Sequence, residues 1–149
     1  MSHDKKRTGA GILFTDGTHI LLLQRAQGSN VGTWGLPGGH TKEGESTLET
    51  AKRETEEETG VKVSGQKFGK CLKEENQKKF TTYYYQVDEQ FDCVISEEHS
   101  DWKWFAIKDL QQIDLHPRFK SELPTYLKEI RKHFCKTFTE WMDIRVLTP

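Results

Sequence analysis

One stretch of this chain, from Gly38 to Val61, constrains its local structure more than any other. Ser46 can cap a helix, and Glu49 follows three residues later, which is the spacing of a capping box. Gly60 can take the left-handed conformation that commonly ends a helix. The sequence therefore predicts a helix over residues 46–59, preceded and followed by glycines.

The acidic residues of this helix gather on one side. At about 100° per residue, Glu57 and Glu58 flank Glu54, whereas Glu56 points the other way. Neighbouring like charges destabilise a helix unless something neutralises them, and Mg²⁺ prefers carboxylate oxygens. The alternative is a solvated surface helix that is simply rich in glutamate. An adjoining face of small and apolar residues predicts packing on a sheet: Leu48, Ala51 and Thr55.

The residues around the helix favour the metal site. Gly38 and Gly39 let the backbone approach a ligand closely and offer a carbonyl oxygen to a cation. Arg53 adjoins Glu54 and could orient its carboxylate through a charge-assisted hydrogen bond.

The same stretch resembles the Nudix box, a pattern of fixed glycine, glutamate and arginine positions with two bulky apolar ones. The matching residues are Gly39, Glu45, Arg53, Glu54, Thr55, Glu57, Glu58, Gly60 and Val61. The one departure is Thr55 at the first apolar position, where its methyl group still permits packing. The match covers residues 39–61 and is highly specific.

The resemblance implies a Nudix fold, which is an α/β/α sandwich with a mixed β-sheet between helices, here as a single domain over residues 1–149. It also implies an enzyme that hydrolyses a nucleoside diphosphate linked to another group, with Mg²⁺ or Mn²⁺. The metal ligands it implies are Gly38 through its carbonyl, Glu54, Glu57 and Glu58. Arg53 joins the catalytic set as the residue that orients Glu54, and Glu45 supports it.

The carboxylate that takes the proton from water varies across this family. Glu54 and Glu57 are candidates, and an acid from a later loop often contributes. Here Glu98, beside Glu97 and ahead of a predicted strand, is that acid. A solvated acidic turn is the alternative interpretation of this pair.

Weaker resemblances bear on the substrate. His40 in LPGGH, and Glu98 spaced with Trp102 and Trp104, resemble the members that act on nucleoside triphosphates. We therefore predict a nucleoside or deoxynucleoside triphosphate pyrophosphohydrolase. The alternatives are a nucleotide-sugar, ADP-ribose or dinucleoside polyphosphate hydrolase, with an RNA-cap pyrophosphatase less favoured. A binding module without catalysis would be expected to lack one or more of the glutamates.

Candidate contacts to the nucleotide lie outside the box. Arg25, at the end of a predicted strand, is a candidate phosphate contact. Aromatic faces hold bases, so Phe80 and Tyr83 are candidate substrate residues, as are other aromatic side chains. The alternative for each aromatic residue is packing in the core. The further aromatic candidates are Trp34, Tyr85 and Trp104.

The remaining pattern predicts a mixed sheet with helices on both faces. Strands are expected over residues 8–15, 19–25, 61–63, 68–73, 80–87 and 101–107. Asp16-Gly17 is a predicted hairpin turn, residues 26–33 a loop, and WGLPGG at 34–39 a rigid break. Helices are expected over residues 108–112 and 117–133, with Pro124 as a candidate kink or break. Residues 134–149 are apolar in part and remain unassigned.

Composition bounds the partners. The net charge of −1 conceals an acidic segment, because seven of the 23 acids lie between Glu43 and Glu58. A divalent metal would invert that local charge, so a nucleotide ligand is compatible with it. The near-neutral net charge offers little electrostatic attraction for a stable nucleic-acid partner. A homodimer is compatible with the composition.

No apolar run approaches the roughly 18 residues that span a bilayer, and no signal-peptide core is visible. We therefore expect a cytoplasmic protein that does not enter a membrane. Three widely spaced cysteines predict reduced thiols: Cys71, Cys93 and Cys135.

Overall fold

The computed structural model describes residues 8–63 and 70–134. The strands are β1 (Gly9–Thr15), β2 (His19–Arg25), β3 (Trp34–Gly35), β4 (Gly38–His40), β5 (Lys70–Gln77), β6 (Phe80–Gln86) and β7 (His99–Ala106). The helices are α1 (Thr47–Thr59), the short 3₁₀ helix η3 (Ile107–Gln112) and α2 (Pro117–Phe134).

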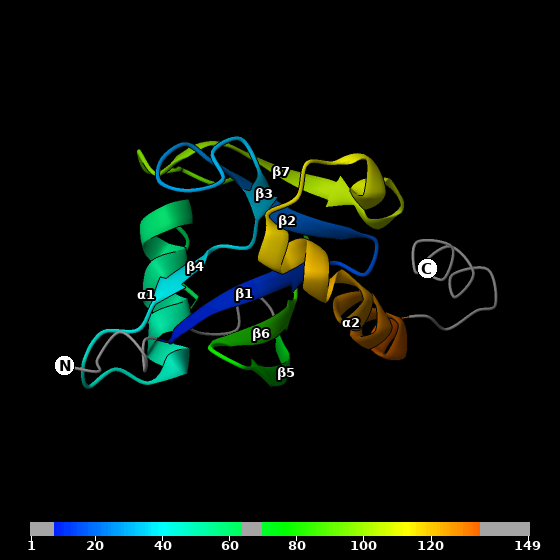
Figure 1. Cartoon of the computed structure of the whole chain (residues 1–149). Helices are drawn as coiled ribbons and strands as arrows, with labels where there is room; N and C mark the ends of the chain where they lie inside the picture. Colours follow the sequence, from blue (N-terminus) through cyan, green and yellow to red (C-terminus); the bar gives the residue numbers. More distant parts are fainter. Residues whose placement is uncertain (1–7, 64–69, 135–149) are drawn as a thin grey trace.

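One mixed sheet carries all of these strands. Its main order is β3-β2-β1-β6-β5, with β7 on β2 and β4 on β1. Strands β1 and β6 run parallel, whereas the other pairs are antiparallel. Strands β1 and β2 pair at Thr15 and Ile20, next to their turn. Further along, β4 pairs with β1 and β3 pairs with β2, so the hairpin opens toward its far end (Figure 1).

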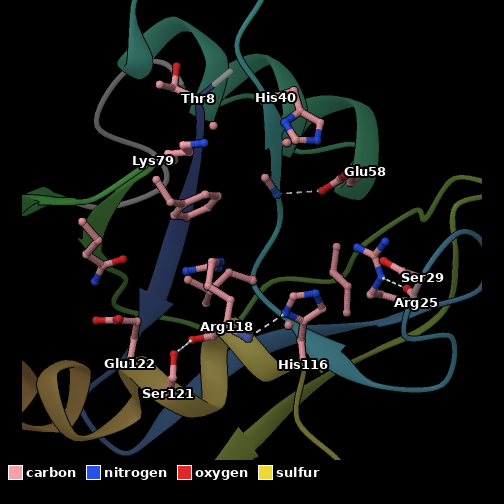
Figure 2. Close-up of a pocket in the computed structure, with 18 of the residues that line it drawn as sticks. Thr8, Arg25, Ser29, His40, Glu58, Lys79, His116, Arg118, Ser121 and Glu122 are labelled. Atoms are coloured by element: carbon pink, nitrogen blue, oxygen red, sulfur yellow. Dashed lines mark hydrogen bonds between the residues drawn. The ribbon is translucent and has the colours of Figure 1, made fainter. Parts of the chain in front are cut away.

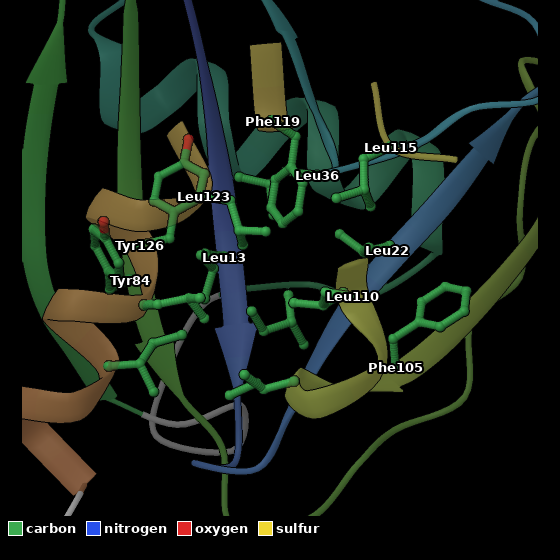
Figure 3. Close-up of a cluster of buried hydrophobic side chains, with 14 residues drawn as sticks. Leu13, Leu22, Leu36, Tyr84, Phe105, Leu110, Leu115, Phe119, Leu123 and Tyr126 are labelled. Carbon is green, nitrogen blue, oxygen red and sulfur yellow. The ribbon is translucent and has the colours of Figure 1, made fainter. Parts of the chain in front are cut away.

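Helices cover both faces of the sheet. Alternate residues of a strand point to opposite faces. Accordingly, Leu13 belongs to a core with α2 and η3, whereas Ile12 and Phe14 belong to a second core that includes Ala51 of α1. Figure 3 shows the first core, in which Tyr126 and Phe119 of α2 pack toward Leu13. The predicted three-layer α/β architecture is confirmed.

Most predicted elements are found, with shifted ends. The capping box at Ser46 and the left-handed Gly60 define α1. Helix α2 continues through the exposed Pro124 and is not split there. Residues 61–63 form no strand, because Val61 and Val63 are buried without ladder pairing. The predicted break at 34–39 contains two short strands, which pair with β2 and β1.

Several expectations fall partly outside the described residues. Cys71 and Cys93 are free thiols, as predicted, and Cys135 lies outside those residues, as does the segment 135–149. Within residues 8–63 and 70–134, no helix has both the length and the apolar character to cross a bilayer. That residues 1–149 form a single domain stays a prediction.

Candidate active site

Helix α1 holds its acidic face against β4. Ala51 and Thr55 are fully buried on the face that the sequence predicts to pack on the sheet. This packing leaves Glu54 and Glu58 next to the glycines of β4. The backbone N–H of Gly38 donates to Glu58 Oε1 at 2.8 Å. A Cβ at Gly39 would lie 2.6 Å from Glu54 Oε1, so a side chain there would displace the Glu54 carboxylate from this position.

Arg53 organises the acids around it. Its Nε donates to Glu45 Oε2 at 2.7 Å and its Nη2 to Glu45 Oε1 at 3.1 Å, which makes a two-point contact. Its Nη1 donates to Glu54 Oε2 at 2.9 Å, and Nη2 donates to the carbonyl of His40 at 3.1 Å. The hydrogen bond from Arg53 lowers the pKa of Glu45 to about 2. Arg53 therefore ties helix α1 to the preceding loop and fixes the orientation of Glu54.

Three carboxylates converge beside this network. One oxygen from each of Glu54, Glu58 and Glu98 lies within 4.8 Å of the others. Burial raises the pKa of Glu58 to about 9, and the nearby charges of Glu54 and Glu98 add to that effect, while the Gly38 hydrogen bond opposes it. A buried carboxylate among other carboxylates is stabilised when a cation neutralises it. The donor set therefore fits a hard divalent cation.

The predicted metal residues do not all lie in this cluster. Glu57 lies outside the three-carboxylate group, and its side chain is 53% exposed and reaches Arg53 Nη1 at 3.3 Å. Glu98, which enters from the loop before β7, takes the third place instead. The helix thus contributes Glu54 and Glu58 directly and leaves Glu57 at the solvent edge of the same face.

A pocket of about 970 Å³ opens beside the carboxylates, where β1 and β2 separate. Glu58 and Arg25 line it, as do Phe80 at the start of β6 and Arg118 in the first turn of α2. Figure 2 shows Glu58 and Arg118 apart from each other around this pocket, with His116 near Arg118. The pocket therefore has Glu58 in one region and Arg118 in a separate one, where Glu122 also lines it.

The predicted substrate residues have different positions. Arg25 lines the pocket, and its Nε donates to the carbonyl of Ser29 at 2.8 Å. Phe80 also lines the pocket, but the guanidinium carbon of Arg118 lies 3.7 Å from its ring centroid. Tyr83 does not line it. This tyrosine is 4% exposed in the core on the α1 side, and its hydroxyl bonds Thr47 Oγ1 at 2.7 Å.

The other aromatic candidates also pack in or against the two cores. Tyr85 and Trp104 belong to the same core as Tyr83. Trp34 makes an edge-to-face contact with Phe105, with ring centroids 4.8 Å apart. Packing therefore accounts for these side chains, in line with the alternative interpretation of the sequence.

Two histidines of the pocket had no role in the sequence interpretation. Burial, and then the charge of Arg25, lower the pKa of His99 to about 4, so its ring is neutral near pH 7. Its buried Nδ1 has no hydrogen-bond partner among the described residues. Burial and the same arginine also lower the pKa of His116. His116 precedes Pro117, and a proline at the first helical position is the one sequence signal that marks this helix start.

Comparisons with known proteins agree with this geometry. The family model described as the NUDIX domain matches residues 5–127. The asymmetrical bis(5'-nucleosyl)-tetraphosphatase of Mus musculus is 33% identical over 126 residues, covering 79% of this chain and 82% of that protein. The 8-oxo-dGTP diphosphatase of Buchnera aphidicola is 33% identical over 78 residues, covering 52% of this chain and 59% of that protein.

Solved structures show the same fold. A Nudix hydrolase from M. smegmatis, RenU, superposes with a TM-score of 0.67 at 23% identity, covering 85% of this chain and 86% of that one. An Ap4A hydrolase binary complex from C. elegans superposes with a TM-score of 0.63 at 23% identity, covering 84% and 98%. Since the family model spans most of the chain, the protein belongs to the Nudix hydrolases, enzymes that act on phosphoric anhydrides and generally use divalent metal ions.

Proposed function

We propose that this protein hydrolyses nucleoside and deoxynucleoside triphosphates to the monophosphate and pyrophosphate, with Mg²⁺ or Mn²⁺. The observation that carries the proposal is the convergence of Glu54 and Glu98 on Glu58, which lines a pocket large enough for a nucleotide. The named activities of the mouse and Buchnera relatives both concern phosphoric anhydrides of nucleotides, which supports the same chemistry here.

The proposed metal ligands are the carboxylates of Glu54, Glu57 and Glu58 and the carbonyl of Gly38, with Glu98 beside them. Glu57 joins this set by turning from Arg53, to which its bonds are long, at 3.3 Å. A divalent cation held there supplies neutralisation of the phosphate oxygens. Arg53 acts as a positioning residue, because its hydrogen bond sets the orientation of Glu54.

Glu98 is the proposed general base. It is the exposed member of the three converging carboxylates, whereas Glu58 is buried and bonded to the Gly38 amide. A carboxylate at the solvent edge can accept a proton from water while the water oxygen attacks phosphorus and the anhydride bond breaks. Arg25, which lines the pocket close enough to His99 to lower its pKa, is the proposed phosphate contact near this end.

A second candidate is hydrolysis of dinucleoside polyphosphates. The pocket carries cationic side chains in two regions, Arg25 in one and Arg118 with Lys78 and Lys79 in the other. A substrate with a long phosphate chain could use both regions. The mouse tetraphosphatase aligns with 79% of this chain, which also favours this candidate.

A substrate panel separates these functions. Purified protein is incubated with Mg²⁺ or Mn²⁺ and each nucleotide, and the products are separated by anion-exchange chromatography. A nucleoside triphosphate is expected to give monophosphate and pyrophosphate. Diadenosine tetraphosphate would give AMP and ATP, and ADP-ribose would give AMP and ribose 5-phosphate.

The matched control is Glu58→Gln, which keeps side-chain size and removes the carboxylate. No turnover of any nucleotide by the folded wild-type protein would contradict the enzyme proposal and leave a binding module. Preference for diadenosine tetraphosphate in kcat/KM would contradict the triphosphate proposal alone. Equal turnover in EDTA would contradict the metal requirement.

A further inference from the structure

Phe80 is the pocket aromatic that the sequence offers for base stacking, yet Arg118 covers one face of its ring. The guanidinium carbon stands 3.7 Å from the ring centroid, which is a stacking separation. The ring also borders the backbone of β1, because a Cβ added at Gly11 would lie 2.9 Å from Phe80 Cζ. Both residues line the pocket, so this pair presents to a ligand a guanidinium that lies over the ring.

Arg118 is held at a second point by a buried hydroxyl. Its Nη1 donates to Tyr126 Oη at 3.0 Å. Tyr126 is fully buried, and its hydroxyl also bonds Thr82 Oγ1 at 3.0 Å. A guanidinium held over a ring and hydrogen-bonded at one edge has little conformational freedom left to lose when a ligand binds. The side chain is therefore preorganised, and the hydroxyl of Tyr126 sets its orientation.

Arg118 lies in a different part of the pocket from the acidic end (Figure 2). Glu58 lines the other region, with Glu54 and Glu98 beside it, and the phosphates must meet the cation there if the proposed function holds. The base of a nucleotide then extends toward Phe80 and Arg118. Arginine guanidinium planes stack on nucleobases, so this end offers a surface for the base.

We propose that Arg118 is the surface on which the nucleobase of the substrate stacks, and that Tyr126 is the residue that positions it. The inference rests on the proposed function for the placement of the phosphates. It replaces direct stacking on Phe80, which here supports the guanidinium from beneath. The rival interpretation of the same geometry is that Arg118 binds a phosphate with its remaining N–H donors.

Saturation-transfer NMR in EDTA separates base from phosphate recognition without any turnover. The probes are AMP, whose H2 and H8 report the base, and ribose 5-phosphate, which lacks one. Wild-type protein is expected to saturate H2 and H8 most strongly. Arg118→Lys keeps the charge and loses the plane, so the base signal should fall several-fold while that of ribose 5-phosphate stays. Lys120→Gln, an exposed cation of the same helix turn, is the matched control.

Steady-state kinetics give the second measurement. On the best triphosphate, Arg118→Lys should raise KM about tenfold and change kcat less than about twofold, since stacking acts on bound substrate and transition state alike. Tyr126→Phe keeps the buried ring and removes the hydroxyl. It should raise KM about threefold without changing kcat, whereas a merely structural defect would lower the folded fraction and so the apparent kcat.

Each outcome decides the proposal. If Arg118→Lys leaves the H2 and H8 signals intact and Phe80→Leu abolishes them, the base stacks on Phe80 and the proposal is wrong. It is also wrong if ribose 5-phosphate loses its signal along with AMP, or if wild-type protein gives no signal with AMP. If AMP contacts depend on Arg118 but no nucleotide is hydrolysed, the proposed function fails and this inference stands.

Discussion

The acidic end of the pocket comes mainly from one continuous segment, residues 38–58, to which Glu98 is added from the loop before β7, whereas the opposite end is assembled from segments far apart in the chain. Glu54 and Glu58 lie one helical turn apart on α1, and the amide that bonds Glu58 belongs to β4, 20 residues earlier. Arg118 instead depends on Phe80 of β6 and on Tyr126, whose partner Thr82 lies 44 residues away. Local spacing therefore encodes the first end, and tertiary packing creates the second.

The two ends also differ in charge stability. At the acidic end, carboxylates crowd together and burial raises the pKa of Glu58 to about 9. At the other end, the guanidinium of Arg118 is supported by a ring and a neutral hydroxyl. The acidic end thus holds a proton on Glu58 near neutral pH until a cation replaces it, and the cationic end is preformed. We expect substitutions at the first end to act on kcat and on pH dependence, and those at the second to act on KM.

The largest expected effect is that of Glu58→Gln at the acidic end. Loss of this carboxylate should lower kcat by a factor on the order of 10³, because a missing ligand removes transition-state charge stabilisation. Glu56→Gln is the control on the exposed opposite side of α1 and should leave kcat unchanged. Steady-state assays with saturating Mg²⁺ measure both, with circular dichroism to check folding. Full activity in Glu58→Gln would remove this residue from the metal site.

Arg53→Lys tests whether the acidic end needs orientation as well as charge. Lysine keeps the positive charge but cannot make the two-point contact to Glu45 together with the bond to Glu54. Activity should fall about 10- to 100-fold, as for other residues that orient metal ligands. The measurement is kcat as a function of Mg²⁺ concentration. Recovery of wild-type kcat at high Mg²⁺ would assign Arg53 to metal affinity alone.

The sequence predicts the first end well because helix geometry is local. The capping box, the glycine end and the side of α1 that carries Glu54 and Glu58 all follow from spacing. Glu57 shows the limit of this reasoning, since a shared face does not say which carboxylate turns inward. Glu98 was reachable only through the family resemblance, because a loop residue has no periodicity to place it.

The second end could not be predicted from the sequence. Alternation along a strand separates its two faces but does not say which face meets the pocket and which meets the core. Phe80 and Tyr83 lie on one strand but point to opposite faces, and only Phe80 meets the pocket. The sequence gives Arg118 the pattern of an ordinary surface arginine. Its place in the pocket follows only from the packing of α2 against the sheet. The strands β3 and β4 escape prediction for a related reason. They are two and three residues long, and pairing with β2 and β1 creates them rather than their own propensity.

The raised pKa of Glu58 at the acidic end predicts a pH dependence of metal-free stability. Glu58 has a pKa raised from 4.5 to about 9, so the folded state holds its proton where the unfolded state has lost it. Its contribution to stability is therefore complete below about pH 4.5 and is lost as pH rises toward 9. In EDTA, Glu58→Gln should melt several degrees above wild type at pH 8.5 and close to it at pH 4.5.

Differential scanning calorimetry across this pH range measures that difference. Mg²⁺ should stabilise wild type more at pH 8.5 than at pH 5.5, because a cation binds the ionised carboxylate. Glu56→Gln serves again as the control, and its melting curve should parallel wild type. A difference in melting temperature between Glu58→Gln and wild type that stays constant across the pH range would mean that folding does not raise the pKa of Glu58. The carboxylate would then be ionised in the metal-free fold.

The smallest expected effect tests whether the docking of α2 is separable from nucleotide binding. Lys73 of β5 reaches Glu129 of α2 at 2.7 Å, and Lys132 reaches the same carboxylate at 3.4 Å. Burial disfavours the charge of Glu129, but the two lysines outweigh it and lower its pKa. Lys73→Met keeps the apolar stem and leaves Lys132 as the partner. It should destabilise the fold by about 1 kcal/mol, because Lys73 is partly exposed and screened by solvent.

Urea unfolding measures this change, with Lys70→Met on the exposed start of the same strand as the control. KM should stay at the wild-type value in Lys73→Met, because Arg118 is held by Phe80 and Tyr126 rather than by this ion pair. A rise in KM comparable to that of Tyr126→Phe would show that the base end senses the position of the whole helix. The contrast between the two ends would then lie in which elements hold each of them. The acidic end depends on α1 with its contacts to β4, the preceding loop and Glu98, and the base end on the seating of α2 against the sheet.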